Sequence, residues 1–178
     1  YDSPHPFESV ILALDSFKES PLLFPPGEKF SYSTHGYILA SAVVERAGKE
    51  PFDDQVRKRI VEPLGLKTLQ PDYQWREIPG RAIGYRRLDG KIARSLDADV
   101  SWKLGGGGYL SNIDDLTRFG LALIKRELVN PATEEKMSTP QPSSDGKNAG
   151  YALGFRVGNV NGRLRVEHSG AQEKTRTQ

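Results

Sequence analysis

The tripeptide Tyr32-Ser33-Thr34 carries one of two sets of side chains that could do acid–base chemistry. It places a phenol between a short extended segment, Lys29–Tyr32, and the start of the most apolar helix expected in the chain. A phenol has an unperturbed pKa of about 10, so it acts as a base only where positive potential stabilises the phenolate. A helix N-terminus supplies about 0.3–1 kcal/mol of that stabilisation, and a neighbouring Lys or His would have to supply the rest. The alternative interpretation is structural, with Ser33 or Thr34 capping the helix.

The second set is His168-Ser169-Gly170, which follows a segment expected to be extended around Val166. An imidazole, a hydroxyl and a glycine in series can line one wall of a cleft that binds an acyl group, because glycine lets a substrate backbone approach. Taken alone, the tripeptide is common, and a turn at the end of a strand is its default interpretation.

Three other patterns favour structural interpretations. Ser144-Asp-Gly-Lys147 matches the S-x-x-K spacing of an activated serine, but it lies in a Pro/Ser/Gly-rich loop where no helix face joins the two side chains. The run Gly105–Gly108 lacks the Lys of a phosphate-binding loop, so we expect close backbone packing or a positive φ there. The histidines His5, His35 and His168 form no metal-binding spacing, so we expect neither a metal site nor a cofactor.

The composition describes a chain large enough to bury a core. It has 178 residues, with 25 Lys and Arg against 23 Asp and Glu, and a formal net charge of +2. This near balance argues against nucleic-acid binding, and the cluster Arg57-Lys58-Arg59 is expected to be a solvated face. No apolar run reaches the 18 residues that a membrane span needs. Cysteine is absent, which excludes disulfides and thiolate chemistry and leaves the compartment undetermined.

The elements that must position these residues are mostly helical before residue 138 and extended after it. Apolar spacing predicts helices over residues 7–18, 34–47, 51–62, 113–124 and 132–137, and the 34–47 helix is apolar almost all round, as a buried helix is. Two hairpins are predicted, 82–87 with 91–94 and 151–158 with 163–167, around Asp89-Gly90 and Asn161-Gly162. This segregation predicts an α+β architecture rather than alternating βαβ units.

Taken in order, the segments of the chain resemble the serine β-lactamase and penicillin-binding-protein superfamily on its class C-like side. The resemblance is greatest to mitochondrial β-lactamase-like proteins and their bacterial relatives. The segments that carry it are residues 23–34, 36–37, 42–48, 63–66, 102–111, 115–120, 151–155 and 168–171. Each segment is weak alone, and their order and spacing over nearly the whole chain make the likeness specific.

The resemblance implies a role for each candidate residue. Tyr32 matches the tyrosine of the family's Tyr-x-Asn element, the general base or proton relay, and Thr34 stands at the Asn position. His168-Ser169-Gly170 stands where lactamases have Lys-Thr-Gly, and family members with His there are commonly esterases or peptidases. Ala171 matches the residue whose backbone N–H forms half of an oxyanion hole. The implied partner is a small-molecule or peptide substrate.

The resemblance also implies that the family's own S-x-x-K element lies N-terminal to these residues. The chain is then expected to be part of one β-lactamase/transpeptidase-like catalytic domain, incomplete at both ends: a mainly helical lobe (1–137), a loop (138–150) and part of an antiparallel sheet (151–178). By itself it is expected to be inactive, and its open strand edges predict self-association. A non-catalytic binding or filament-type assembly module is the alternative function. A bacterial member is expected in the periplasm or outside the cell.

Overall fold

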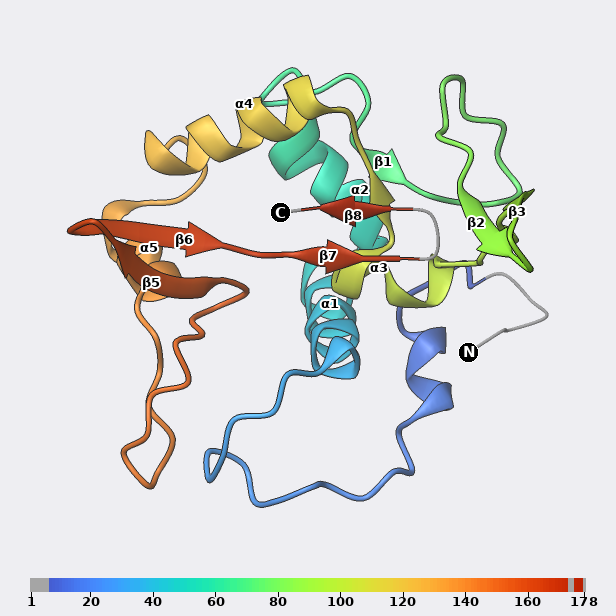
Figure 1. Ribbon diagram of the computed structural model, residues 1–178. Coiled ribbons are helices and arrows are strands. Elements are labelled where there is room, and N and C mark those ends of the chain that lie inside the picture. Colours follow the sequence, from blue (N-terminus) through green and yellow to red (C-terminus); the bar gives the residue numbers. More distant parts are fainter. Residues whose placement is uncertain (1–6, 173–174, 178) are drawn as a thin grey trace.

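The computed structural model describes residues 7–172 and 175–177 (Figure 1). Its α-helices are α1 (Thr34–Gly48), α2 (Phe52–Val56), α3 (Leu104–Gly107), α4 (Ile113–Ile124) and α5 (Pro131–Ser138). Short 3-10 helices η1 (Leu12–Ser16) and η3 (Ser101–Lys103) and a π-helical turn η2 (Arg57–Val61) accompany them. The strands are β1 (Gln70–Pro71), β2 (Tyr85–Leu88), β3 (Lys91–Arg94), β4 (Tyr109–Leu110), β5 (Arg156–Val160), β6 (Arg163–Glu167), β7 (Gly170–Ala171) and β8 (Arg176–Thr177).

The architecture is α+β, as predicted. The described strands pair antiparallel, as β1 with β4, β2 with β3, β5 with β6 and β7 with β8. The helices pack together as a lobe, whereas β6 and β7 follow one another along a nearly straight path across it (Figure 1). The core lies among the helices, where Val10, Ala42, Tyr73 and Leu104 form one buried cluster.

Helix α1 begins where the capping chemistry predicts. Ser33 is extended, and its Oγ accepts a hydrogen bond from the backbone N–H of Gly36 at 3.1 Å, so Ser33 rather than Thr34 is the cap. The helix runs one residue beyond the predicted end and closes at Lys49, which adopts the left-handed conformation with φ 54°. Tyr32 therefore lies immediately before a capped helix N-terminus.

The glycine run lets α3 pack directly against α1. A Cβ on Gly105 would lie 2.7 Å from the backbone oxygen of Tyr37 and 2.6 Å from Cβ of Ser41. A Cβ on Gly106 would lie 2.6 Å from the methyl of Thr34, and Gly107 has φ +132°. These contacts confirm close packing and positive φ as the reason for the run.

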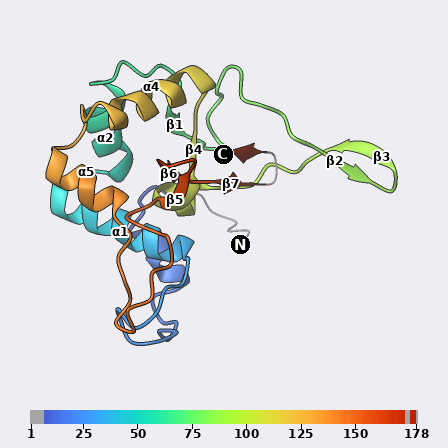
Figure 2. The ribbon, with the colours of Figure 1, turned by 60° about the vertical axis from the view of Figure 1, so that its left-hand side comes forward.

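Both predicted hairpins form around their predicted turns. Asp89 and Gly90 have φ of 48° and 77°, and Asn161 and Gly162 have φ of 52° and 79°, the positive values that a tight hairpin turn requires. The β2–β3 hairpin extends away from the helical lobe (Figure 2). Strand β3 has its predicted bounds, whereas β2 begins three residues later and ends one residue later than predicted. The β5–β6 hairpin leads directly to His168.

The buried carboxylate of Asp115 fixes the start of α4 against the segment that follows η2. Asn112 caps the helix by accepting from the Asp115 backbone N–H at 2.9 Å. Oδ2 of Asp115 accepts from the backbone N–H groups of Lys67 at 2.8 Å and Thr68 at 2.5 Å, and from the Thr68 hydroxyl at 2.7 Å. The Thr68 hydroxyl, followed by these backbone donors, lowers the pKa of Asp115.

The predicted helix at the N-terminal side is wrong in extent. Residues 7–18 form only the 3-10 helix η1, where Ser9 Oγ accepts from the Ile11 N–H and Ser16 Oγ donates to the Ala13 oxygen. Such local bonds compete with the α-helical pattern. The segment 29–32, predicted to be extended, pairs with no strand in the described chain.

The prediction that α1 is buried all round is also wrong. Ile38, Ser41 and Ala42 are buried, but Leu39 and Val43 are 50% and 60% exposed. The elements that pack most closely on α1 are α2, α3, η1 and η3, and they leave these side chains uncovered. The predicted 51–62 helix forms as α2 followed by the π-helical turn η2, where Arg57, Lys58 and Arg59 are exposed as expected.

Candidate active site

Tyr32 and His168 lie side by side, although they come from opposite ends of the chain. Tyr32 precedes α1 and His168 lies between β6 and β7, and their ring centroids are 5.9 Å apart with the planes tilted by 37°. Tyr32 is 51% exposed, and His168 is exposed as well. A phenol and an imidazole that reach solvent together can exchange protons with a molecule bound against them.

Two further aromatic side chains complete what we call the aromatic cluster, made of Phe30, Tyr32, Tyr151 and His168. The ring of Tyr151 lies 6.0 Å from Tyr32, 6.0 Å from His168 and 5.3 Å from Phe30. The hydroxyl of Tyr151 is 3.0 Å from Nε2 of His168. Sequence reasoning named no role for Tyr151, and its sole signal was its place at the start of segment 151–155.

Tyr37, one turn into α1, joins the cluster through Tyr151. A Cβ built on Gly154 would lie 3.5 Å from the Tyr37 hydroxyl oxygen, so the side chain of Tyr37 reaches the turn that follows Tyr151. Burial raises the pKa of Tyr37, and burial followed by the neighbouring Tyr37 and Tyr32 raises the pKa of Tyr151 to about 12. Both phenols therefore keep their protons at neutral pH and act as hydrogen-bond donors.

The residues around His168 are held by a short strand pair. Gly170 and Ala171 form β7, which pairs with β8, and Gln172 donates its side-chain N–H to the backbone oxygen of Gly107 at 2.7 Å. A Cβ on Gly170 would lie 2.5 Å from Oγ1 of Thr177, so a side chain here would make the Thr177 hydroxyl move. This contact favours glycine at 170 without a substrate.

Thr34 and Ser169 differ in their surroundings. The methyl of Thr34 faces Gly106, so this half-buried residue packs against the glycine run. Ser169 is exposed, as are Gly170 and Ala171. Substrate contacts by Thr34, Ser169, Gly170 and Ala171 stay predictions.

The Ser144–Lys147 match lies in a loop away from any helix. The ammonium of Lys147 pairs with Asp145 at 2.7 Å and its side chain is 85% exposed. The loop closes through a bond from the Ser144 N–H to the Gly27 oxygen at 2.8 Å. The match is a turn sequence in this fold.

Within residues 7–172 and 175–177, no three His, Asp or Glu side chains gather to hold a metal ion, and His5 lies outside these residues. None of the described helices is long and apolar enough to cross a membrane.

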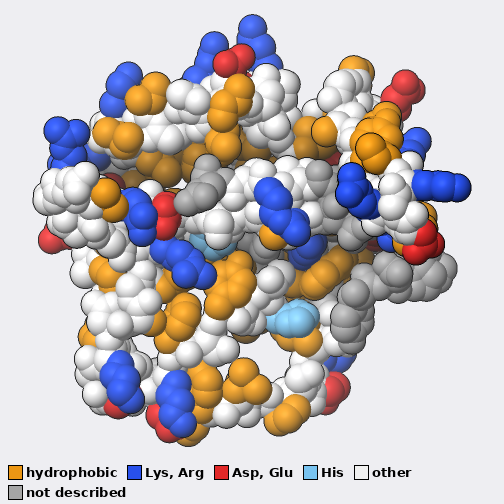
Figure 3. Space-filling model, in the orientation of Figure 1, with side chains coloured by type: hydrophobic (Ala, Val, Ile, Leu, Met, Phe, Trp, Pro, Cys, Tyr) orange, Lys and Arg blue, Asp and Glu red, His pale blue; other side chains and the backbone are white. Residues whose placement is uncertain are grey.

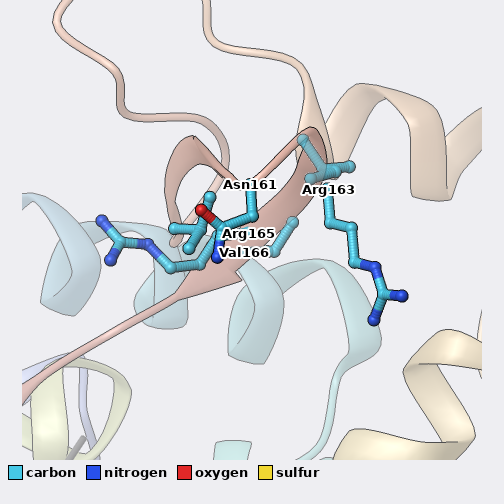
Figure 4. Close-up of a pocket in the computed structure, with 6 residues that line it drawn as sticks. Asn161, Arg163, Arg165 and Val166 are labelled. Carbon is cyan, nitrogen blue, oxygen red and sulfur yellow. The ribbon is translucent and has the colours of Figure 1, made fainter.

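A surface depression lies at the turn of the β5–β6 hairpin, lined by Val160, Asn161, Arg163, Leu164, Arg165 and Val166. The guanidinium groups of Arg163 and Arg165 extend away from each other there (Figure 4). None of the lining residues belongs to the aromatic cluster, so the depression has no link to the candidate chemistry.

Comparison with known proteins identifies relatives over most of the chain. The beta-lactamase family model matches residues 4–177. The mitochondrial serine beta-lactamase-like protein LACTB of Mus musculus is 33% identical over 170 residues, which span 85% of this chain and 31% of that relative. The chain thus spans about a third of the length of this relative.

Solved structures have the same fold. The penicillin-binding protein from Bacillus halodurans superposes with a TM-score of 0.75 at 25% identity, covering 91% of this chain and 51% of that one. The D-amino acid amidase from Ochrobactrum anthropi, complexed with D-phenylalanine, gives a TM-score of 0.77 at 20% identity, covering 97% and 53%.

Proposed function

The chain belongs to the β-lactamase family, and from that membership we propose that it is part of a serine hydrolase that works through an acyl-enzyme. The bond cleaved is an ester, amide, peptide or β-lactam bond. The similarity to a D-amino acid amidase and to a penicillin-binding protein favours amide-type substrates. Residues 1–178 would form one part of the catalytic domain, with a helical lobe, a loop and part of its sheet.

The observation that carries this proposal is the contact between Tyr32 and His168. In the proposed mechanism, Tyr32 takes the proton of a serine hydroxyl as that oxygen attacks the substrate carbonyl carbon. The carbonyl π electrons move to oxygen, and the backbone N–H of Ala171 donates to this oxyanion. His168 and Ser169 hold the acyl part of the substrate.

In the remaining steps, Tyr32 passes its proton to the leaving group and later takes one from water. When the tetrahedral intermediate collapses, the bond to the leaving group breaks and the leaving group takes the proton held by Tyr32. Water then attacks the acyl-serine with its proton passing to Tyr32, and the serine oxygen departs with that proton.

The nucleophilic serine and its lysine are proposed to come from an S-x-x-K element outside residues 1–178. Ser144-Asp-Gly-Lys147 is the one match in this sequence, and its exposed turn offers no shared helix face. The 178-residue chain alone is accordingly proposed to be inactive.

Turnover of p-nitrophenyl acetate and of a D-amino acid p-nitroanilide by the full-length protein tests this function. Tyr32→Phe should lower kcat/KM by about 100-fold or more, the usual contribution of a general base. Tyr85→Phe removes a hydroxyl from the distant β2–β3 hairpin and should leave turnover unchanged.

Full activity in the Tyr32→Phe variant would remove Tyr32 from the mechanism. A full-length protein that turns over neither substrate and carries Gly or Ala in place of the S-x-x-K serine would favour the assembly-module alternative.

A further inference from the structure

Gln172 links the end of β7 to the glycine run of the helical lobe. Its side-chain Nε2–H donates to the backbone oxygen of Gly107 at 2.7 Å, across 65 residues of sequence. Because a carbonyl oxygen only accepts, the amide N–H group of Gln172, and not its own carbonyl, must face Gly107. Strand β7 passes beside α3 at this point (Figure 1).

The backbone of Gln172 is held independently of its side chain. Its N–H donates to the Thr175 oxygen at 2.9 Å, and its oxygen accepts from the Thr175 N–H at 3.3 Å and from Nη1 of Arg176 at 2.9 Å. The residue itself is half-buried. With the backbone held in this way, the side-chain bond acts on the position of the β7–β8 pair as a whole.

The same backbone bonds determine where the Ala171 N–H points. In an antiparallel pair, residues that exchange both hydrogen bonds alternate with residues that exchange none. Gln172 and Thr175 exchange both, so the neighbouring pair of Ala171 and Arg176 exchanges none. The Ala171 N–H therefore points away from β8, toward the edge of β7 that no described strand covers. A strand-edge N–H of this kind is available to an oxyanion.

Gly107 lies in the part of the helical lobe that packs against the start of α1. A Cβ on the preceding Gly106 would lie 2.6 Å from the Thr34 methyl and 3.2 Å from the Thr34 oxygen, so the two backbones nearly touch. Thr34 is the first residue of α1 and follows Tyr32 by two positions. The Gln172–Gly107 bond thus joins β7 to the segment that carries Tyr32.

We propose that Gln172 is a positioning residue, whose bond to Gly107 holds the Ala171 N–H at a fixed place relative to Tyr32. The catalytic meaning rests on the proposed function, in which Tyr32 takes the serine proton while the Ala171 N–H donates to the oxyanion. That negative charge develops only as the serine attacks. A displaced donor therefore weakens stabilisation of the transition state and leaves ground-state binding of the substrate nearly unchanged.

Steady-state kinetics of the full-length protein tests this role, with the working enzyme counted by active-site titration. Gln172→Met keeps the length of the side chain and removes the donor, and Gln172→Glu turns acceptors alone toward the Gly107 oxygen. Each variant should lower kcat about 3- to 10-fold and leave KM nearly unchanged, the size expected for one hydrogen bond that solvent reaches.

Gln141→Met is the matched control. Gln141 also donates its side-chain Nε2–H to a backbone oxygen, that of Thr139 at 3.0 Å, but it does so within the 138–150 loop. Its loss should leave kcat and KM unchanged. An unchanged kcat in the Gln172 variants, or an equal decrease in Gln141→Met, overturns the proposal. If Gln172→Met fails to fold by near-ultraviolet circular dichroism, Gln172→Glu decides.

The ¹³C signal of the Gly107 carbonyl separates this proposal from the proposed function, because it reports the bond without turnover. In isotopically labelled full-length protein the signal should move in both Gln172 variants and stay in place in Gln141→Met. That pattern in a wild type without hydrolytic activity would support Gln172 as the link between β7 and the helical lobe and contradict the function. A Gly107 signal that neither Gln172 variant moves overturns the proposal, even in an active hydrolase.

Discussion

At the scale of single residues, the two candidate tripeptides are explained partly by structure and partly by chemistry. Ser33 is an ordinary helix cap, and glycine at 170 is favoured by the close Thr177 side chain. Packing alone does not explain Tyr32 and His168, because both reach solvent at the same place. The chemical interpretation therefore rests on the phenol and the imidazole rather than on the whole of either tripeptide.

Asp115 gives a residue-scale prediction about acid stability. Its pKa is lowered chiefly by the Thr68 hydroxyl, so the ionised carboxylate stabilises the fold. This contribution is present above the unfolded-state pKa, near 3.8, and is lost as pH falls through the lower folded-state pKa. Asp115→Asn should lower the melting temperature at pH 7 and flatten its decline in acid, measured by circular dichroism.

Asp114 is the control, since it occupies the same first turn of α4 and is exposed. Asp114→Asn should keep the wild-type pH dependence. An equal decrease of the melting temperature in both variants would mean that the interaction with the helix N-terminus, and not the contact with Thr68, accounts for the effect.

At the scale of elements, α1 positions most of the candidate site. Its cap lies next to Tyr32, its second turn carries Tyr37, and the glycine run packs against its side. The distance between α1 and α3 therefore depends on residues that have no side chain. A change in that distance would move Tyr37 and so alter its packing against the aromatic cluster.

Gly105→Ala tests this contact. Its Cβ would lie 2.7 Å from the Tyr37 backbone oxygen, so we expect overpacking to destabilise the protein by about 1–3 kcal/mol, measured by chemical unfolding. Gly120→Ala in α4 is the matched control, because nothing lies within 4 Å of its added Cβ. That variant should gain about 0.5–1 kcal/mol from helix propensity. Unchanged stability in Gly105→Ala would contradict the packing role of the run.

At the scale of the whole molecule, apolar side chains reach the surface over much of the face shown in Figure 3. Large examples that are at least half exposed include Leu39 and Val43 on α1 and Ile113 and Ile124 on α4. The matched parts of the solved neighbours are about half of those chains. Exposed apolar area of this kind favours association with another surface.

The 178-residue chain should accordingly self-associate in a concentration-dependent way, as measured by sedimentation velocity. Leu39→Gln with Val43→Thr removes apolar surface from α1 and should shift the distribution toward monomer. Leu88→Gln removes a similarly exposed side chain from the β2–β3 hairpin and should have a smaller effect. A monomer at all concentrations would contradict the expectation.

The sequence by itself determined two things. One is the set of local features fixed by residues within four positions of each other, and the other is the family to which the chain belongs. Local capping chemistry limited the α1 cap to Ser33 or Thr34, and the turns at Asp89-Gly90 and Asn161-Gly162 follow from positive φ. The α+β segregation follows from the order of the helical and extended segments. The prediction of a helix at 7–18 failed because hydrogen bonds made there by serine side chains compete with the helix that the apolar spacing predicts.

Tertiary structure alone decided which distant groups meet. The alignment of Tyr37, Tyr151 and His168 depends on a turn, a helix and a strand end that come from three separate segments. The exposure of Leu39 and Val43 likewise depends on which elements pack against α1. Helical periodicity predicts which residues share a face of the helix, but it does not predict which elements bury that face. Local sequence encodes conformation, whereas these contacts arise only when the folded chain brings remote segments together.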